Sequence, residues 1–300
     1  MNRGIFPGWN RAANGVMYPS SRLVVSGAFA ASVNAGAEFS GSLTVDGGLW
    51  PYRASLSGSP PPELNVSPVL VDGARWKIAA AGYGATGGTY NFNVIVVSAD
   101  GQSVTAAQTV QVQSPIVPWD SATKGTNITL TNGNTTATKT TSNAHSAVIG
   151  TVAKSSGKWY FEVHVDTAVS TDGIIIGAEK VAPGSTFVGA PTYGFGYYQT
   201  GQKINASTTL SFGSSYTTGD VIGVAIDATA QKIWFAKNNT WQASGDPSAG
   251  TNEAFSTAMA PSIYPAASVY YGTGDAVTIR SRAAEFSYSP PSGFTEWASP

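Results

Sequence analysis

The chain of 300 residues contains no cysteine. Disulfide bridges, thiolate nucleophiles and sulfur-ligated zinc sites are therefore excluded. Charge is also scarce: 11% of the residues are charged, against roughly 25% in typical soluble proteins, and the formal net charge is -1. Because nucleic-acid binding needs several Lys or Arg side chains to neutralise phosphates, we expect neither nucleic acid nor an anionic membrane as a partner.

Long hydrophobic runs are absent as well. No apolar stretch approaches the roughly 18 residues that a membrane-spanning helix requires, so we expect no membrane insertion. The first 26 residues contain Arg3, Arg11 and Arg22 with no uninterrupted apolar stretch between them. This pattern predicts that the chain has no secretory signal peptide.

Groups suited to acid–base catalysis are few. The histidines are His145 and His164, and histidine is the side chain that titrates nearest neutral pH. Glu162 and His164 fall on the polar face of a predicted strand, Lys158 to Asp166, and we interpret them as a surface pair rather than a catalytic dyad. Glu162 and Asp166 lie roughly 13 Å apart along that strand, too far for the roughly 5–9.5 Å of a glycosidase carboxylate pair.

Signatures of metal and phosphate loops are missing too. The sequence has no clustered Asp-x-Asp, no His-x-x-x-His and no Gly-rich loop with the lysine of a phosphate loop. We therefore predict a protein that is not an enzyme, with no catalytic residues, no metal site and no cofactor. The weaker alternative is a polysaccharide-degrading enzyme whose carboxylate pair comes from distant loops.

The strongest positive signal is a pair of alternating segments at residues 219–227 and 233–239, joined by residues 228–231. Ile222, Val224 and Ile226 share one face, because side chains alternate along an extended backbone. This pattern predicts a β-hairpin in a β-sandwich or barrel.

This hairpin closely resembles the central hairpin of SPRY domains. Four further segments of the chain resemble other parts of SPRY domains, and they occur in the same order as in that family. They are the opening strand (residues 157–163), a Tyr-Gly strand (193–197), the penultimate strand (264–269) and the closing segment (286–294). Upstream, Trp119-Asp120 and residues 127–133 are similar to the entry strand of bacterial and phage SPRY domains. The resemblance covers residues 117–300 and implies a SPRY-like β-sandwich.

A second β module is predicted at residues 23–114. Residues 88–97 and 103–112 alternate around Asp100-Gly101, and Asp-Gly between alternating strands is a strong hairpin signal. These strands, with residues 50–64, closely resemble a family of bacterial immunoglobulin-like domains, although Glu63 replaces the family's usual glycine. We therefore predict an all-β chain with two β-sandwiches in tandem, immunoglobulin-like and then SPRY-like.

Residues 1–22 fit neither module. Gly and Pro interrupt regular structure there, while Ile5, Phe6 and Trp9 are side chains that require burial. We interpret the segment as an irregular arm that docks onto another subunit through these three residues. The alternative is a tail that folds back over its own immunoglobulin-like module.

Aromatic and amide side chains lie at predicted strand ends of the SPRY-like module. By resemblance, SPRY domains bind partners through loops at one end of the sandwich, and Tyr and Trp supply large contact area with few torsions to freeze. The alternative for Trp241 and for each tyrosine is packing in the core or at its rim. The predicted ligand- or partner-binding residues are Tyr197, Tyr198, Gln199, Asn238, Asn239, Trp241, Tyr270 and Tyr271.

This combination of modules resembles bacteriophage virion proteins. It implies a non-enzymatic tail, baseplate-fibre or receptor-binding protein, whose SPRY module binds a glycan or protein of the host cell surface and whose arm contacts other virion structural proteins. The alternative is a purely structural capsid-decoration, neck or baseplate subunit whose SPRY module binds a neighbouring virion protein. We expect many copies on the exterior of the particle, with a homo-oligomer as one arrangement.

Overall fold

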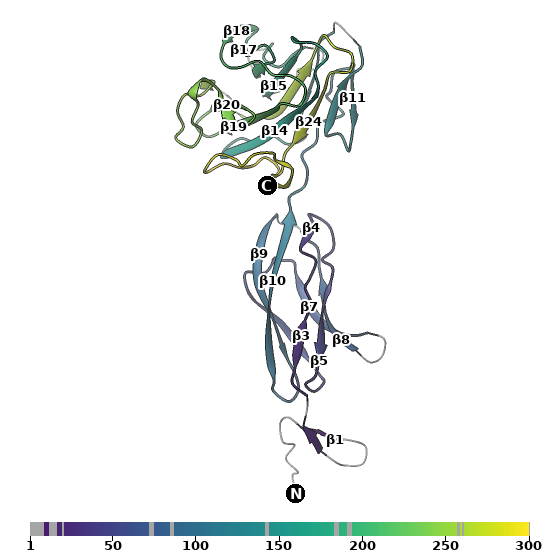
Figure 1. Ribbon diagram of the computed structural model, residues 1–300. Helices are drawn as coiled ribbons and strands as arrows, with labels where there is room; N and C mark the ends of the chain where they lie inside the picture. The colour runs from purple at the N-terminus through teal and green to yellow at the C-terminus, as the bar shows by residue number, and fades with distance from the viewer. Residues whose placement is uncertain are drawn as a thin grey trace. The chain divides into compact units, whose positions relative to one another are not determined.

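The computed structural model of the chain describes residues 9–11, 17–19, 21–71, 75–84, 87–141, 144–182, 186–190, 194–256, 259 and 261–299. The chain divides into two compact units, Met1–Pro115 and Ile116–Pro300. Regular structure in the described residues is β-strand apart from short 3-10 turns, which confirms the predicted all-β fold class (Figure 1). No helix in this part of the chain is long and apolar enough to cross a membrane.

The predicted docking arm is only partly described. Ile5 and Phe6 lie outside the described residues, whereas Trp9 begins β1 (Trp9–Arg11), which pairs antiparallel with β2 (Met17–Pro19). The described part of this segment is therefore a pair of short antiparallel strands. Its docking role stays a prediction.

The rest of the N-terminal unit is a sandwich of two four-stranded sheets, with strand orders β3-β5-β8-β7 and β4-β10-β9-β6. Pairing is antiparallel except between β4 and β10. The strands are β3 (Val24–Ser26), β4 (Ser32–Asn34), β5 (Ser42–Asp46), β6 (Arg53–Gly58), β7 (Asn65–Val71), β8 (Arg75–Ala81), β9 (Gly88–Val97) and β10 (Ser103–Gln113).

The core of this unit lies between its two sheets. Phe92, Val94 and Val96 of β9 are buried, as predicted from their alternation, and Leu43 and Ile78 of the other sheet pack in the same cluster. β9 and β10 pair continuously from their turn onward, which confirms the predicted hairpin.

The C-terminal unit is a sandwich of a nine-stranded and a six-stranded sheet. The larger has the order β11-β12-β24-β14-β19-β20-β21, with β22 added to β20 and β25 to β14; the smaller has the order β13-β23-β15-β16-β17-β18. The strands of the larger sheet are β11 (Ile128–Thr131), β12 (Thr136–Lys139), β14 (Lys158–Thr167), β19 (Val221–Asp227), β20 (Lys232–Lys237), β21 (Thr240–Trp241), β22 (Phe255–Ser256), β24 (Ala276–Arg280) and β25 (Thr295–Glu296). Those of the smaller sheet are β13 (Ser146–Ile149), β15 (Ile174–Glu179), β16 (Gly194–Tyr198), β17 (Gln202–Asn205), β18 (Thr208–Ser211) and β23 (Tyr264–Val269).

The predicted central hairpin is β19 and β20, which pair from Ile222↔Lys237 to Asp227↔Lys232. Ile222, Val224 and Ile226 point into the main core between the sheets, as predicted. The residues that alternate with them are buried as well, so β19 has no solvent-exposed face.

Connecting segments cover both outer faces of this sandwich. Val188 packs against Ile175 in a small cluster on the outer face of the six-stranded sheet. Phe294, from the C-terminal segment, packs against Trp234 in a cluster on the outer face of the nine-stranded sheet. The C-terminal unit therefore contains a main core and two smaller ones.

Candidate interaction surface

Several strands of the two C-terminal sheets end at the same edge of the sandwich. The loop between β18 and β19 crosses from one sheet to the other there: Tyr216 N donates to Gln199 O (3.0 Å), and Gly219 N donates to Val165 O (2.8 Å). The end of β20 is tied to the start of β19, because Asn238 N donates to Val221 O (2.8 Å). Strand ends that are distant in the sequence thus form one surface, the loop end.

One part of the loop end is an aromatic cluster of His145, Phe187, Tyr270 and Tyr271. His145 stacks on Tyr270 with ring centroids 3.9 Å apart and planes at 16°. The other neighbours pack at larger angles, Phe187 at 4.6 Å from His145 and Tyr271 at 4.2 Å from Tyr270. Tyr271 is 41% exposed, so the cluster presents one aromatic ring to solvent on a rigid stack.

Polar groups lie next to this cluster. Burial, followed by a hydrogen bond to Asp172 and the charge of that carboxylate, raises the pKa of the Tyr198 hydroxyl. Asp172 Oδ1 and Ser170 Oγ are buried without a hydrogen-bond partner among the described residues. Burial and the nearby Lys139 lower the pKa of His145, which favours the neutral form of the stacked imidazole.

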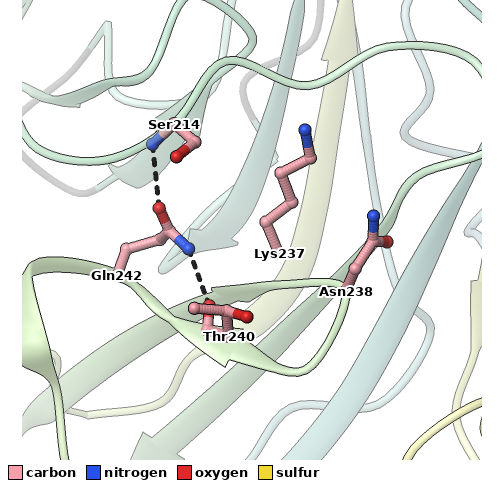
Figure 2. Close-up of a pocket in the computed structure, with 5 residues that line it drawn as sticks. All are labelled: Ser214, Lys237, Asn238, Thr240 and Gln242. Atoms are coloured by element: carbon pink, nitrogen blue, oxygen red, sulfur yellow. Dashed lines mark hydrogen bonds between the residues drawn. The ribbon is translucent and has the colours of Figure 1, made fainter.

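A second part of the loop end is a pocket of about 260 Å³ (Figure 2). Its walls are fixed by hydrogen bonds: Gln242 Oε1 accepts from Ser214 N (2.8 Å), and Gln242 Nε2 donates to Thr240 O (2.6 Å). Lys237 Nζ donates to Ser215 O (2.8 Å) and lies 3.1 Å from Asp220 Oδ2. The lining residues are Ser214, Lys237, Asn238, Thr240 and Gln242.

Five of the eight predicted contact residues are at or near the surface of the loop end, namely Tyr198, Tyr270, Tyr271, Asn238 and Asn239. The structure brings the first three together around the aromatic cluster and places Asn238 at the pocket. Asn238 also has a structural task, since its Oδ1 accepts from Val221 N (2.8 Å) and its Nδ2 donates to Asp220 Oδ1 (2.7 Å).

Two of the predicted contact residues, Tyr197 and Gln199, lie inside the domain rather than at its surface. Tyr197 is fully buried and its hydroxyl donates to Ser214 O. Gln199 is 1% exposed, and its Oε1 accepts from Gly173 N and Ile174 N (3.1 Å each). The loop between β18 and β19 covers Tyr197, and the segment between β14 and β15 holds the side chain of Gln199, whose Nε2 donates to Ser170 O (2.6 Å). Trp241 is half-buried and packs edge-on against Tyr160 at 6.4 Å, which is its alternative placement at the rim of the core.

The predicted surface pair Glu162 and His164 is also corrected. Glu162 is fully buried beneath the C-terminal segment, where its carboxylate accepts from Ser287 N (2.7 Å) and Tyr288 N (2.9 Å). Its Oε2 lies 3.9 Å from Arg280. Burial raises the pKa of Glu162 although these hydrogen bonds and Arg280 act in the opposite direction.

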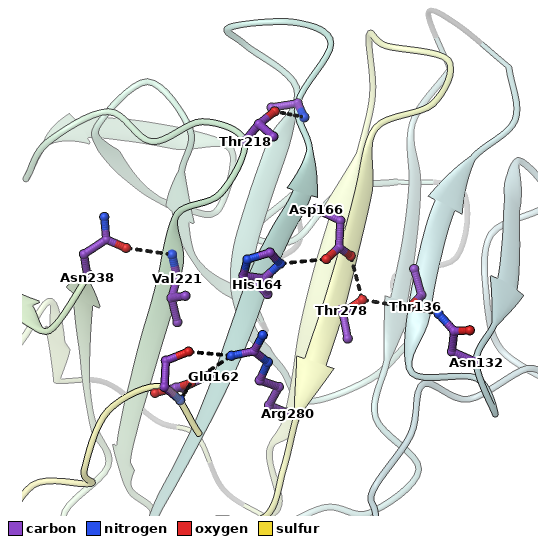
Figure 3. A network of polar contacts seen from close by, with 12 residues as sticks. Asn132, Thr136, Glu162, His164, Asp166, Thr218, Val221, Asn238, Thr278 and Arg280 are labelled. Atoms are coloured by element: carbon purple, nitrogen blue, oxygen red, sulfur yellow. Dashed lines mark hydrogen bonds and ion pairs between the residues drawn. The ribbon is translucent and has the colours of Figure 1, made fainter. Parts of the chain in front are cut away.

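His164 pairs with Asp166 instead, at 2.6 Å between Nδ1 and Oδ1. Figure 3 shows the row of polar contacts that continues from Asp166 to Thr278 and Thr136 across three strands, with hydroxyl distances of 2.6 and 2.7 Å. His164 Nδ1 and both carboxylate oxygens of Asp166 are thus engaged in a network on the surface of the sheet. Among the described residues no group of three or more His, Asp or Glu side chains could hold a metal ion.

Sequence patterns missed several members of the loop end. His145 and Phe187 lie in connecting segments without periodicity, and Asp172 is one acidic residue in a turn. Gln242 directly follows Trp241, which was predicted as a contact residue. This neighbouring position was the signal by which the sequence could have indicated Gln242. Their convergence depends on strand pairings that no local pattern contains.

Known proteins resemble parts of this chain. The Set1 complex component ash2 of Schizosaccharomyces pombe is 34% identical over 111 residues, which cover 32% of this chain and 17% of that protein. The chain thus spans far less than two thirds of this relative. A crystal structure of the SPRY domain of human HERC1 matches 54% of this chain and 96% of its own chain, with a TM-score of 0.44 and 22% identity.

The comparison with ash2 corrects the predicted function. The relative belongs to a eukaryotic protein complex, so the prediction of a bacteriophage virion protein is wrong, both as a tail or receptor-binding protein and as a structural virion component. The predicted virion and host-surface partners and the predicted place on the exterior of a particle are overturned by the same finding.

The resemblance to SPRY domains in general, in contrast, is confirmed for the central part of the predicted module. The family model described as the SPRY domain matches residues 158–280, a span that begins at the start of β14 and ends at the end of β24. The central hairpin, the Tyr-Gly strand and the penultimate strand all lie within it. The C-terminal unit of this chain therefore contains a SPRY domain.

Proposed function

We propose that the C-terminal unit is a non-catalytic module that binds a partner polypeptide at its loop end. The observation that carries this proposal is the exposed Tyr271 ring on the rigid stack of Tyr270 and His145. A preorganised aromatic side chain contributes contact area without much loss of side-chain entropy on binding, which is the property of interface hot spots.

A role within a multiprotein assembly is supported by the name of the relative, a component of the Set1 complex. We extend to this chain only the general role, that of a subunit holding another protein. The low charge of the chain favours contacts built from aromatic, hydroxyl and amide groups over contacts built from ion pairs.

The arrangement of acidic groups favours binding over catalysis. Glu162 is engaged by two backbone amides, and Glu179 is buried under the segment that follows β15. His145 is held in the aromatic stack. Each of these groups therefore serves packing or hydrogen bonding within the domain, and the loop end offers rings and amides rather than an acid–base pair.

We also propose that residues 23–114 form an immunoglobulin-like domain. Two four-stranded sheets packed around one core support this assignment, because facing antiparallel sheets with alternating strands are the architecture of immunoglobulin-like sandwiches. Such a domain would serve as a spacer or a second contact module in the assembly.

The proposal is tested by selecting binders to the full chain from a displayed peptide library. Tyr271→Ala should weaken the selected peptides by about 2 kcal/mol, roughly thirtyfold, if this ring is the anchor. The matched control is Val152→Ala, since Val152 is also 41% exposed but lies in the loop between β13 and β14, outside the loop end. Selected peptides that bind Tyr271→Ala as tightly as the unaltered chain, or a selection without enrichment, would contradict the proposed function.

A further inference from the structure

The N-terminal unit exposes a tryptophan that its own core does not use. Trp50 is 62% exposed, the highest value among the exposed large apolar side chains of the described residues. Removal of apolar surface from water is favourable by roughly 25 cal/mol per Å², so an exposed aromatic ring gains free energy when a ligand or partner covers it. Trp50 is therefore a candidate contact residue.

The Trp50 ring is held in place. It stacks on Trp76 with centroids 5.9 Å apart and planes at 26°. Trp76 is in turn fixed by Tyr52, whose ring packs edge-on at 5.8 Å and whose hydroxyl donates to Gly47 O (2.7 Å). One face of the Trp50 ring is thus occupied, and its high exposure leaves the other as a flat platform.

A pocket begins at the next residue. Its volume is about 290 Å³, and its lining residues are Pro51, Arg53, Val97, Ser98, Ala99 and Gly101. The segment that carries Trp50 is tied to this pocket, because Ala99 N donates to Leu49 O (2.8 Å). The volume is near the lower end of the range for small-molecule sites, about 300–1,000 Å³, so it suits a ligand of one or two rings.

The charged group that lines the pocket is Arg53. It is exposed, and the described residues give its side chain neither a hydrogen bond nor an ion pair. Asp100, close by, is engaged by Ser98 Oγ and by Gln102 Nε2 (2.8 Å). The guanidinium of Arg53 therefore has its donors available for an anionic group of a ligand, such as a carboxylate, which a guanidinium binds with a bidentate pair of hydrogen bonds.

A pyranose ring that carries a carboxylate matches this combination. Its C–H face is apolar and stacks on a flat indole, its carboxylate accepts a bidentate pair of hydrogen bonds from a guanidinium, and its hydroxyls bond to backbone groups of a turn. Trp50 and Arg53 are three residues apart, at most roughly 11 Å of extended chain, a span that one or two sugar rings bridge. A nucleic acid fits less well, because one arginine neutralises too few phosphates.

We propose that Trp50, Arg53 and the adjoining pocket form a binding site for acidic saccharides, with one sugar ring stacked on Trp50 and its carboxylate on Arg53. This site belongs to the N-terminal unit and does not depend on the function proposed for the loop end.

Calorimetric titration of the full chain with oligogalacturonate, oligomannuronate and hyaluronan hexasaccharides tests the proposal, with carboxyl-reduced versions as neutral probes. We expect at least one acidic probe to bind, and Trp50→Ala to weaken it about tenfold or more. Arg53→Ala should weaken the acidic probe to the level of its reduced form and leave the reduced form unchanged. Trp50→Phe, which keeps a smaller ring, should retain part of the affinity.

The matched control is Tyr83→Ala. Tyr83 is 57% exposed in the same unit and its hydroxyl donates to Glu38 (3.1 Å), so its removal should leave saccharide binding unchanged. Absence of heat for all three acidic probes would overturn the proposal, as would equal binding by Trp50→Ala. Tighter binding of an acidic peptide than of any saccharide, or a concentration-dependent dimer that Trp50→Ala abolishes in sedimentation, would assign the platform to a protein contact instead.

Discussion

The two sandwiches of this chain differ in what lies on their outer faces. In the N-terminal unit, β10 alternates between exposed or half-buried and more deeply buried positions, so one face meets solvent. In the C-terminal unit, β15 and β19 are buried at every position. When polar and apolar residues alternate along a strand, the sequence indicates which face of the strand points to the core. When a strand is buried on both faces, another segment must cover the outer face of its sheet.

The covering segments explain the difference. Val188 and its neighbours cover the six-stranded sheet, and the chain from Phe286 to Phe294 covers the nine-stranded sheet. Each covering segment donates backbone N–H groups to a buried carboxylate of the sheet beneath it. Glu179 Oε1 accepts from Gly189 N (2.8 Å), and Glu162 accepts from Ser287 N and Tyr288 N. The outer layers of the C-terminal unit are therefore attached by hydrogen bonds to acidic side chains.

Removal of the Glu162 carboxylate should have the largest effect on the stability of the C-terminal unit, because it detaches one of the covering segments. Glu162→Ala leaves Ser287 N, Tyr288 N and the hydroxyl of Tyr160, which donates to Glu162 at 3.0 Å, without an acceptor. Because each donor that loses its acceptor in this buried site costs about 1–3 kcal/mol, we expect the three donors together to account for a loss of about 3–5 kcal/mol. Chemical denaturation monitored on the C-terminal unit measures it.

The control for that loss is a polar outer-face residue of the other sandwich. Ser55 is an exposed position of β6, and Ser55→Ala should change stability by no more than about 0.5 kcal/mol. If Glu162→Ala is as mild as Ser55→Ala, the C-terminal segment is not held by this carboxylate.

Glu179 should make the C-terminal unit sensitive to pH. Burial raises its pKa to about 8, against which the hydrogen bond from Gly189 acts only partly. In the unfolded chain a Glu titrates near about 4.3, so between about 4.3 and 8 unfolding releases a proton. The folded state is therefore favoured by the uncharged form of Glu179. This contribution to the free energy of unfolding is complete below that pH window and is lost as the pH rises through it, at up to about 1.4 kcal/mol per pH unit.

The variant Glu179→Gln isolates this effect. Its amide oxygen can still accept from Gly189 N, but it cannot ionise. Denaturation at pH 6 and pH 7 should therefore show a smaller decrease in stability for the variant than for the unaltered chain. Parallel decreases would mean that the raised pKa of Glu179 does not control the attachment of this covering segment.

The parts of the fold that local patterns predicted are hairpins of strands that are neighbours in the sequence. The β9–β10 hairpin was predicted from alternation and from Asp100-Gly101, and β19–β20 from the spacing of Ile222, Val224 and Ile226. Both pair as expected. These signals are local, because strand alternation and turn chemistry depend on neighbouring residues.

The parts that failed depend on distant segments. Tyr197 and Gln199 were predicted to be accessible because a strand end is normally exposed, but the loop between β18 and β19 buries Tyr197 and the segment between β14 and β15 buries Gln199. His145 gave no signal, because its partner Tyr270 is 125 residues away in the chain. The sequence thus predicted that the candidate site lies at these strand ends. It did not predict which of the residues there are buried or stacked and which are exposed.

The smallest expected effect tests whether the two sandwiches unfold separately. Gly101 in the N-terminal unit and Gly250 in the C-terminal unit both adopt positive φ, +86° and +73°, and an added Cβ at either position would have no heavy atom within 4 Å. Alanine at each position therefore adds backbone strain and no clash, at a cost of about 1 kcal/mol. In calorimetry, Gly101→Ala should lower only the transition of the N-terminal unit, and Gly250→Ala only that of the C-terminal unit. Each variant is the control of the other, because the strain is similar and only its location differs. A single transition that both variants shift equally would show that the units unfold as one, and the difference between their outer faces would then not translate into separate stabilities.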